Sequence, residues 1–167
     1  MKTAKKDFKN IGIGKRLRLA HIAFARGMRV ELADAGVTFG QFVHLERLWS
    51  EDGLTQVELS RRVGVEMASS TSILVELEAL GLIRRARGEA DRRKIFVHLT
   101  AKGREVAGPI LENVKAVNKA ARRGISDDEL NAAFAVLEAI TANLNTKYPN
   151  GLAARSDREA KGLMERA

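Results

Sequence analysis

The sequence predicts a mainly α-helical fold with one small β-hairpin, and three observations support this. Hydrophobic residues make up 45% of the 167 residues, so the chain can bury a core. Aromatic residues contribute only 5% and there are two prolines, a composition that favours helices. Apolar residues recur at helical spacing along most of the chain, whereas one stretch near residue 95 changes to a period of two.

The charge of the chain predicts a polyanionic partner. Twenty-nine Lys and Arg against 21 Asp and Glu give a formal net charge of +8, which attracts nucleic acids and anionic membranes before specific contacts form. No apolar run approaches the roughly 18 to 20 residues that a membrane-spanning helix needs, and the start of the chain lacks the apolar core of a secretory signal. We therefore expect no membrane partner and a cytoplasmic location.

Three helices are predicted in the first part of the chain, the first over about residues 15–34. The next two begin at capping boxes, in which a hydroxyl and a side chain three residues later satisfy each other's free backbone N–H groups. Thr38 with Gln41 and Thr55 with Glu58 fit this pattern. The apolar face of the first helix consists of Leu17, His21, Phe24, Met28 and Leu32.

A fourth helix is predicted over about residues 66–79, ending before Gly81. We expect its apolar side chains, Leu74 and Leu77 among them, to face the short helix before it. Its start is rich in small hydroxyl residues, which are poor helix formers and indicate selection for something other than stability. This run, expected on the opposite face, is Ala68, Ser69, Ser70, Thr71 and Ser72.

A β-hairpin with a basic loop is predicted next. Ile95, Val97 and Leu99 alternate with their neighbours, which is typical of a half-buried strand. Only Glu89 and Asp91 counter the positive charge of this region. Its basic residues are Arg84, Arg85, Arg87, Arg92, Arg93 and Lys94.

This order of elements, a short helix, a glycine turn, a helix with a small polar start and a basic hairpin, is that of a winged helix-turn-helix. The major groove of DNA admits a helix whose first residues face base edges, and a basic hairpin tip can enter the narrow minor groove. The sequence therefore predicts that double-stranded DNA is contacted by Ala68, Ser69, Ser70, Thr71, Ser72, Arg87, Arg92, Arg93 and Lys94.

Two long helices are predicted after Thr100, the second opened by a capping box of Ser126 and Glu129. A winged helix-turn-helix is compact without them, so we expect these helices and the first one to form an interface with a second subunit. Their apolar stripes are Val106, Ile110, Val114, Val117 and Ala121, then Leu130, Phe134, Leu137, Ile140 and Leu144.

Three fragments, in order and at matching separations, resemble the MarR family of transcriptional regulators. They are GLTQVELSRRVGV (53–65), STSILVELEALGLIRR (70–85) and ADRRKIFVHLTAKG (90–103). The resemblance implies a homodimeric, sequence-specific regulator, a repressor on a pseudo-palindromic operator. It also implies a wing pair in which Asp91 shapes Arg93 for the minor groove, with Arg92 near the DNA backbone. Gly88-Glu89-Ala90 departs from the Asn-Pro or Asp-Pro that usually starts this loop.

The predicted organisation is a single MarR-like domain over residues 15–149, between a basic tail (1–14) and a polar tail (150–167). Within it, the winged helix-turn-helix covers about 38–100, and the dimerisation helices cover about 15–34 and 101–147.

The resemblance further implies a site for a small effector, commonly an aromatic acid, between the dimer helices and the DNA-binding lobe. No motif fixes its residues, and a cationic histidine there would suit a carboxylate. The candidates, which could equally be core and interface residues, are His21, Phe24, Met28, His44 and Trp49.

Two other functions are compatible with the same sequence features. A winged-helix module for protein contacts and a nonspecific architectural DNA-binding protein both fit the fold, and Asp91 with Arg93 could be only an exposed ion pair worth under about 1 kcal/mol. The chain has no cysteine, its histidines lack the spacing of a zinc protease site, and it shows no nucleotide-binding fingerprint. We therefore expect no enzymatic activity, metal or cofactor.

Overall fold

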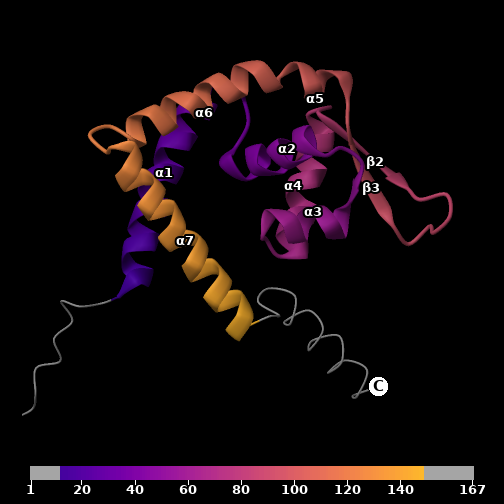
Figure 1. The fold of residues 1–167 in the computed structure, drawn as a ribbon. Helices are drawn as coiled ribbons and strands as arrows, with labels where there is room; N and C mark the ends of the chain where they lie inside the picture. The colour runs from indigo at the N-terminus through magenta and orange to yellow at the C-terminus, as the bar shows by residue number, and fades with distance from the viewer. Residues whose placement is uncertain (1–11, 149–167) are drawn as a thin grey trace, which may run out of the picture.

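The computed structural model describes residues 12–148, which form seven helices and a three-stranded antiparallel sheet (Figure 1). The predicted mainly helical fold with a small hairpin is confirmed. The predicted tails lie almost wholly outside the described residues. The elements are α1 (Ile13–Leu32), α2 (Phe39–Ser50), β1 (Leu54–Thr55), α3 (Gln56–Val63), α4 (Met67–Ala79), β2 (Ile83–Arg87), β3 (Ile95–Leu99), α5 (Ala101–Glu105), α6 (Ala107–Ala121) and α7 (Asp127–Lys147).

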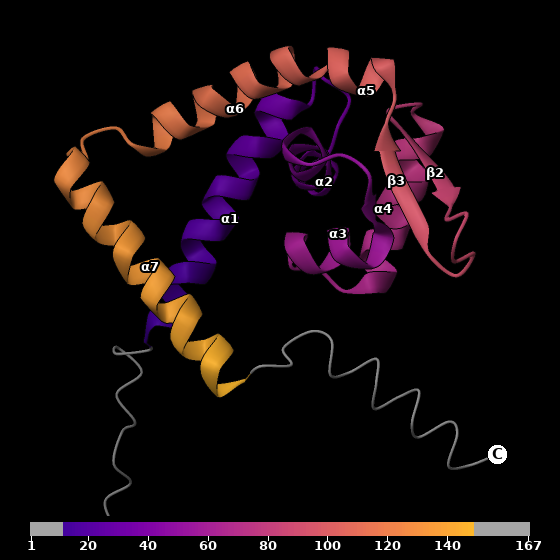
Figure 2. The same ribbon diagram turned by 45° about the vertical axis from the view of Figure 1, so that its right-hand side comes forward.

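The helices divide into a compact lobe and an extended arm. Helices α2, α3 and α4 pack with the sheet in the lobe, while α6 leaves it through α5 and runs along α1 to the turn before α7 (Figures 1 and 2). Both views show α7 standing apart from the lobe. The chain passes between the lobe and this arm, which consists of α1, α6 and α7, at α5 and at the connection between α1 and α2.

Local signals determine where the helices of the lobe begin and end. Both predicted capping boxes form. The hydroxyls of Thr38 and Thr55 each accept from the backbone N–H three residues later, and their own backbone N–H groups donate to the side-chain oxygens of Gln41 and Glu58. Gly64 ends α3 with φ 75°, a left-handed conformation that costs glycine little and other residues more. The helix-turn-helix therefore forms as predicted.

The sheet has the strand order β1-β3-β2, and β3 pairs with both neighbours. The hairpin of β2 and β3 is the predicted one. The pairing of β1 was not predicted, and it places Leu54 opposite Val97, so that the start of α3 is fixed to the base of the hairpin.

One core unites the lobe with the end of α1 and with α6. Met28 and Leu32 of α1, Leu74 and Leu77 of α4, and Ile110 of α6 all have at most 1% of their surface exposed. Burial of such side chains stabilises the fold by about 1.5–3 kcal/mol each. The expected inward face of α4 is confirmed at Leu74 and Leu77. Met28, Leu32 and Ile110 belong to stripes that the sequence assigned to a second subunit, but they are buried within one copy of the chain.

The first predicted C-terminal helix differs from the structure, because it is broken into α5 and α6 at Val106. Pro109 explains the break: its nitrogen cannot donate to the carbonyl of Glu105, and its ring would clash with that carbonyl in a continuous helix. The direction of the arm relative to the lobe is therefore set at residues 106–109.

Much of the apolar stripe of α7 is left exposed by the described residues. No residue of α7 is buried, and Phe134, Leu137 and Leu144 are 50%, 43% and 52% exposed. Leu17 on the first half of α1 is 38% exposed as well. These faces are the ones that the sequence assigned to a second subunit.

Candidate nucleic-acid interface

Helix α4 is held in the lobe by side-chain hydrogen bonds from α2 and α3. From α2, Gln41 donates through Nε2 to Glu76 at 2.9 Å, and His44 bonds through Nε2 to the hydroxyl of Ser70 at 3.0 Å. From α3, the Gln56 amide donates to Thr71 Oγ1 at 2.6 Å. These bonds fix both the rotation of α4 about its axis and its position along that axis.

The rotation of α4 corrects one predicted DNA contact. Ser70 is fully buried and its hydroxyl is bonded to His44, so its side chain cannot reach DNA in this structure. Thr71 is half-buried and donates to the carbonyl of Met67. Ala68, Ser69 and Ser72 are exposed, and they form the accessible part of the predicted set.

His44 is a buried, neutral histidine. Its Nδ1 lies 2.8 Å from the carbonyl of Gly40, which can only accept, so Nδ1 carries the proton and Nε2 accepts from the Ser70 hydroxyl. Burial lowers the pKa of His44 and outweighs the opposite effect of the Gly40 carbonyl. His44 has no exposed surface, and both of its ring nitrogens have partners within the lobe, so this structure offers no contact between His44 and an effector.

The base of the wing is tied to the end of α4. Glu78 accepts from the backbone N–H and the Nε of Arg85 at 2.8 and 2.9 Å, and these bonds keep the pKa of Glu78 below its usual value. Arg85 is thus engaged in the fold, whereas Arg84 and Arg87 of the same strand are exposed.

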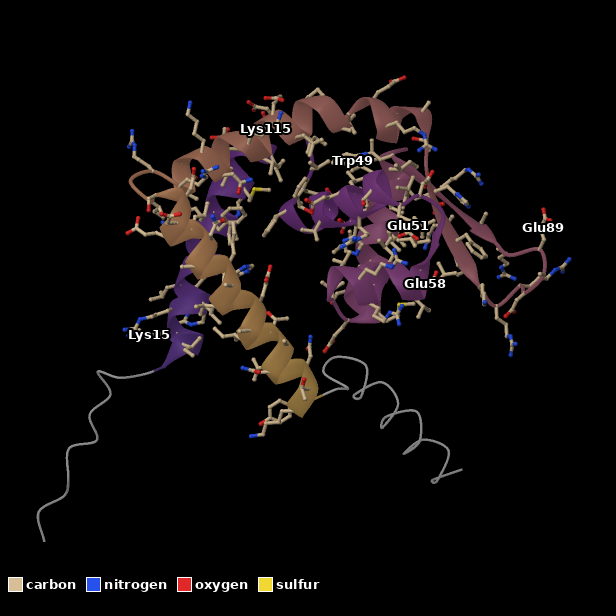
Figure 3. The ribbon with its side chains drawn as sticks, in the orientation of Figure 1. Lys15, Trp49, Glu51, Glu58, Glu89 and Lys115 are labelled. Atoms are coloured by element: carbon tan, nitrogen blue, oxygen red, sulfur yellow. The ribbon has the colours of Figure 1, made fainter. Side chains whose placement is uncertain are left out.

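The tip of the wing carries the predicted pair of Asp91 and Arg93. Asp91 Oδ1 accepts from the backbone N–H of Arg93 at 3.0 Å and from its Nε at 3.2 Å, while the Arg93 side chain stays 93% exposed. Arg87, Arg92 and Lys94 are exposed beside it. Figure 3 shows Glu89 at the outer end of the hairpin, away from the body of the lobe. The structure brings these basic residues together as one exposed surface.

Gly88 closes the wing turn. A Cβ at this position would lie 2.8 Å from the carbonyl oxygen of Asp91 and 2.9 Å from the ring of Phe96, so no side chain fits. Its N–H donates to the carbonyl of Lys94 at 2.9 Å. This glycine departs from the usual proline-containing start of the loop, yet the turn is well defined.

Asp52 is a site residue that the sequence analysis missed. Its carboxylate accepts from the backbone N–H groups of Gly53 and Leu99 at 2.9 Å each and from Arg104 at 2.8 Å. Burial opposes ionisation, but these bonds together hold the pKa of Asp52 below its ordinary value. Asp52 therefore joins the loop after α2, the base of the wing and α5, which are far apart in the sequence.

The five candidate effector residues do not gather in one place. His21 and Phe24 line a pocket of about 590 Å³ between α1 and α6, with Gly27 and Val117. Met28 is fully buried in the core and His44 is enclosed between α2 and α4. Trp49 donates to the carbonyl of Gly103 at 2.8 Å, and it lies close to α5 (Figure 3). Only His21 and Phe24 of the five therefore share an open cavity.

Neither a metal cluster nor a membrane span is found in the part of the chain that the structure describes. Residues 12–148 contain no group of three or more His, Asp or Glu side chains placed to hold an ion. Within the same range, no helix has the length and apolarity to cross a bilayer.

The sequence matches the model of the MarR family over residues 37–95, from the end of the α1–α2 connection to β3. It is 40% identical over 86 residues to the HTH-type transcriptional regulator TtmR of Methylorubrum extorquens, covering 52% of this chain and 44% of that protein. It is 31% identical over 94 residues to the HTH-type transcriptional regulator MgrA of Staphylococcus aureus, covering 56% and 63%. The chain thus spans about half the length of the curated relatives it matches.

Solved structures resemble nearly all of the described fold. A probable transcriptional regulator from Pseudomonas aeruginosa is 25% identical with a TM-score of 0.73, over 79% of this chain and 98% of that one. A MarR-family regulator from Silicibacter pomeroyi is 26% identical with a TM-score of 0.65, over 77% and 86%. A MarR variant from E. coli in complex with operator DNA is 21% identical with a TM-score of 0.74, over 79% and 95%, and shares the fold.

Proposed function

We propose that the chain, which matches the MarR family model over residues 37–95, is a DNA-binding transcriptional regulator of that family without enzymatic activity. The curated relatives are HTH-type transcriptional regulators, and a protein of the same fold has been solved with operator DNA. One observation is the main support for the proposal: the exposed start of α4 and the exposed arginines of the wing belong to one lobe, in which Glu78 and Arg85 join α4 to the base of the wing.

Each of these two surfaces suits one groove of DNA. Ala68, Ser69 and Ser72 lie at the start of α4, where a recognition helix in the major groove meets base edges. Arg93 extends from the wing with its geometry set by Asp91, and a guanidinium is attracted to the negative potential of a narrow minor groove. In this proposal Arg87, Arg92 and Lys94 contact the sugar-phosphate backbone.

We propose that the working unit is a homodimer built from α1, α6 and α7. The exposed stripes of Phe134, Leu137 and Leu144 on α7 and of Leu17 on α1 are the surfaces that a second copy would bury. In such a dimer, two α4 helices about 34 to 36 Å apart would enter successive major grooves of a pseudo-palindromic site. The division into a reading lobe at 38–100 and dimerisation helices around it belongs to this proposal.

We propose that an effector binds in the pocket that His21 and Phe24 line. A BpsR protein from Bordetella bronchiseptica, which is 23% identical with a TM-score of 0.72, has DNA binding regulated by 6-hydroxynicotinic acid. The pocket here lies between α1 and α6, two of the proposed dimerisation helices. A ligand that binds better to one arrangement of these helices would favour that arrangement, and would thereby change the distance between the two α4 helices. Repression by promoter occlusion, relieved by such a ligand in the cytoplasm, is the regulation that we propose.

DNA binding is tested with duplexes that contain a selected inverted repeat or a scrambled version of it. We expect a preference of roughly a thousandfold or more for the repeat, and a log affinity that falls with log salt by about 0.9 per phosphate contact. Equal binding to both duplexes would favour an architectural protein. Salt-independent or absent binding would favour a module for protein contacts.

A further inference from the structure

Helix α4 lacks the side chains that identify purines in the major groove. Guanine is recognised there by bidentate bonds from Arg or Lys, and adenine by bidentate bonds from Asn or Gln. Over Met67–Ala79, α4 contains none of these four residue types. If this helix enters the major groove, as proposed above, its selectivity must come from other chemistry.

The accessible face of α4 offers methyl groups and hydroxyls instead. Ala68 and Val75 lie seven residues apart, two turns along the same side of the helix. Val75 is 49% exposed, so about half of this apolar side chain is open to solvent. Ser69 and Ser72 are exposed between them, while the opposite side is occupied by the buried Ser70, Leu74 and Leu77.

The acidic residues of α4 are largely engaged elsewhere. Glu76 accepts from Gln41 of α2 at 2.9 Å, and Glu78 is bonded to Arg85 at the base of the wing. The short side chains of Ala68, Ser69 and Ser72 leave room for the helix backbone to approach base edges closely. The apolar groups of this face would then be in direct contact with the bases.

Only thymine presents an apolar group, its 5-methyl, at the major-groove edge of a standard base pair. Serine hydroxyls can donate to or accept from any base and discriminate little. We propose that α4 selects thymine, through contact of Ala68 and Val75 with thymine 5-methyl groups, while Ser69 and Ser72 add hydrogen bonds of low selectivity. This inference rests on the proposed function and specifies the class of DNA that the same site recognises.

Replacement of thymine by deoxyuridine tests the inference, because it removes one methyl group and changes neither base pairing nor the minor groove. A tight-binding duplex is first selected from random sequence with the full chain, and each thymine of a half-site is then replaced in turn. We expect affinity to fall about fourfold at the contacted thymines, the effect of one buried methyl group. At a position changed to C·G, we expect 5-methylcytosine to bind about fourfold more tightly than cytosine.

Protein variants connect each methyl group to a side chain. Val75 is exposed and alanine is the better helix former, so Val75→Ala should fold normally. At one thymine, replacement by deoxyuridine should no longer weaken DNA binding by this variant, whereas at the other contacted thymines it should still do so. Ala68→Gly should lose this sensitivity to deoxyuridine at a different thymine. Val57→Ala is the matched control, since Val57 is a 65% exposed valine on α3 of the same lobe, and it should keep full sensitivity.

The outcomes separate this inference from the function on which it rests. If a specific duplex is found and deoxyuridine binds as well as thymine at every position, methyl recognition is wrong and the DNA-binding function stands. Sensitivity that persists unchanged in both α4 variants would also overturn the assignment. If selection yields no preferred duplex, the proposed sequence-specific function fails together with the inference.

Discussion

Gly103 occupies a position at which no side chain fits, although its backbone is ordinary helix. A Cβ there would lie 2.0 Å from the carbonyl oxygen of Leu82 and 3.3 Å from the side chain of Leu99. The same carbonyl accepts from the N–H of Thr100 at 3.0 Å, so it cannot move without breaking that bond. Close packing of α5 on the base of the wing therefore requires glycine.

Gly103→Ala should accordingly destabilise the fold by about 1–3 kcal/mol or more, as overpacking does. Thermal unfolding at fixed protein concentration measures the change. Gly108→Ala, five residues later on α6, is the control: nothing lies within 4 Å of its added Cβ, so stability should stay level or rise by up to about 1 kcal/mol. Equal effects of the two substitutions would contradict the packing argument.

His44 should make stability depend on pH in the range where carboxylates are still ionised. Burial lowers its pKa in the folded state, so the unfolded chain, with a pKa near 6.5, binds more protons as the pH falls. The free energy of unfolding should therefore be full above about pH 6.5 and decline toward pH 5. Denaturant unfolding of the original protein and of His44→Gln should show a smaller decline for the variant; parallel pH profiles would exclude His44 as the cause.

At the scale of single elements, a substitution at the tip of the wing should change DNA binding without changing the stability of the fold. Arg93 is 93% exposed and its pair with Asp91 is a surface interaction, so Arg93→Ala should leave thermal unfolding within about 1 kcal/mol. Its loss should weaken DNA binding about tenfold to a hundredfold, the range for hydrogen bonds to a charged group.

Fluorescence anisotropy with the selected duplex, at several salt concentrations, checks this prediction. Arg122→Ala is the control, because Arg122 carries the same charge, pairs with an exposed Asp127 and lies at the turn between α6 and α7, away from the lobe. An Arg93→Ala protein that binds like the Arg122→Ala protein would mean that the wing pair does not meet DNA.

Elements whose ends depend on neighbouring residues could be predicted from the sequence. The capping boxes placed the starts of α2 and α3 correctly, because a hydroxyl and a residue three positions later decide the matter locally. The strand β1 could not be predicted in this way, since its two residues become a strand only by pairing with Val97 and Phe96 far along the chain. The break at Val106 did have a local signal in Pro109.

The candidate DNA-binding residues could likewise be predicted from the sequence only in part. Composition alone identified the small polar start of α4, but it could not distinguish Ser70 from Ser69 and Ser72. Helical spacing could have done so, because Ser70 shares a face with Leu74 and Leu77, four and seven residues later. The contacts of His44 and Asp52 join segments far apart in sequence and required the structure.

At the scale of the whole molecule, the arm has a face that one copy of the chain does not cover. Phe134, Leu137 and Leu144 follow one side of α7 and remain 50%, 43% and 52% exposed. Isolated helices are marginal in water, and most of their stability in proteins comes from packing of an apolar face. We therefore expect α7 to depend on association with a second copy.

Leu137→Asp should disrupt that association, because a charge in an apolar interface loses its hydration without gaining a partner. Sedimentation at micromolar concentration should show a dimer for the original protein and a monomer, with reduced helix content, for the variant. Asn143→Asp adds the same charge on another side of α7 and should remain dimeric. If Leu137→Asp sediments as the original protein does, the stripe of α7 is not the subunit interface. If the variant is monomeric, it should also lose its preference for an inverted repeat over a single half-site, because that preference requires two linked α4 helices.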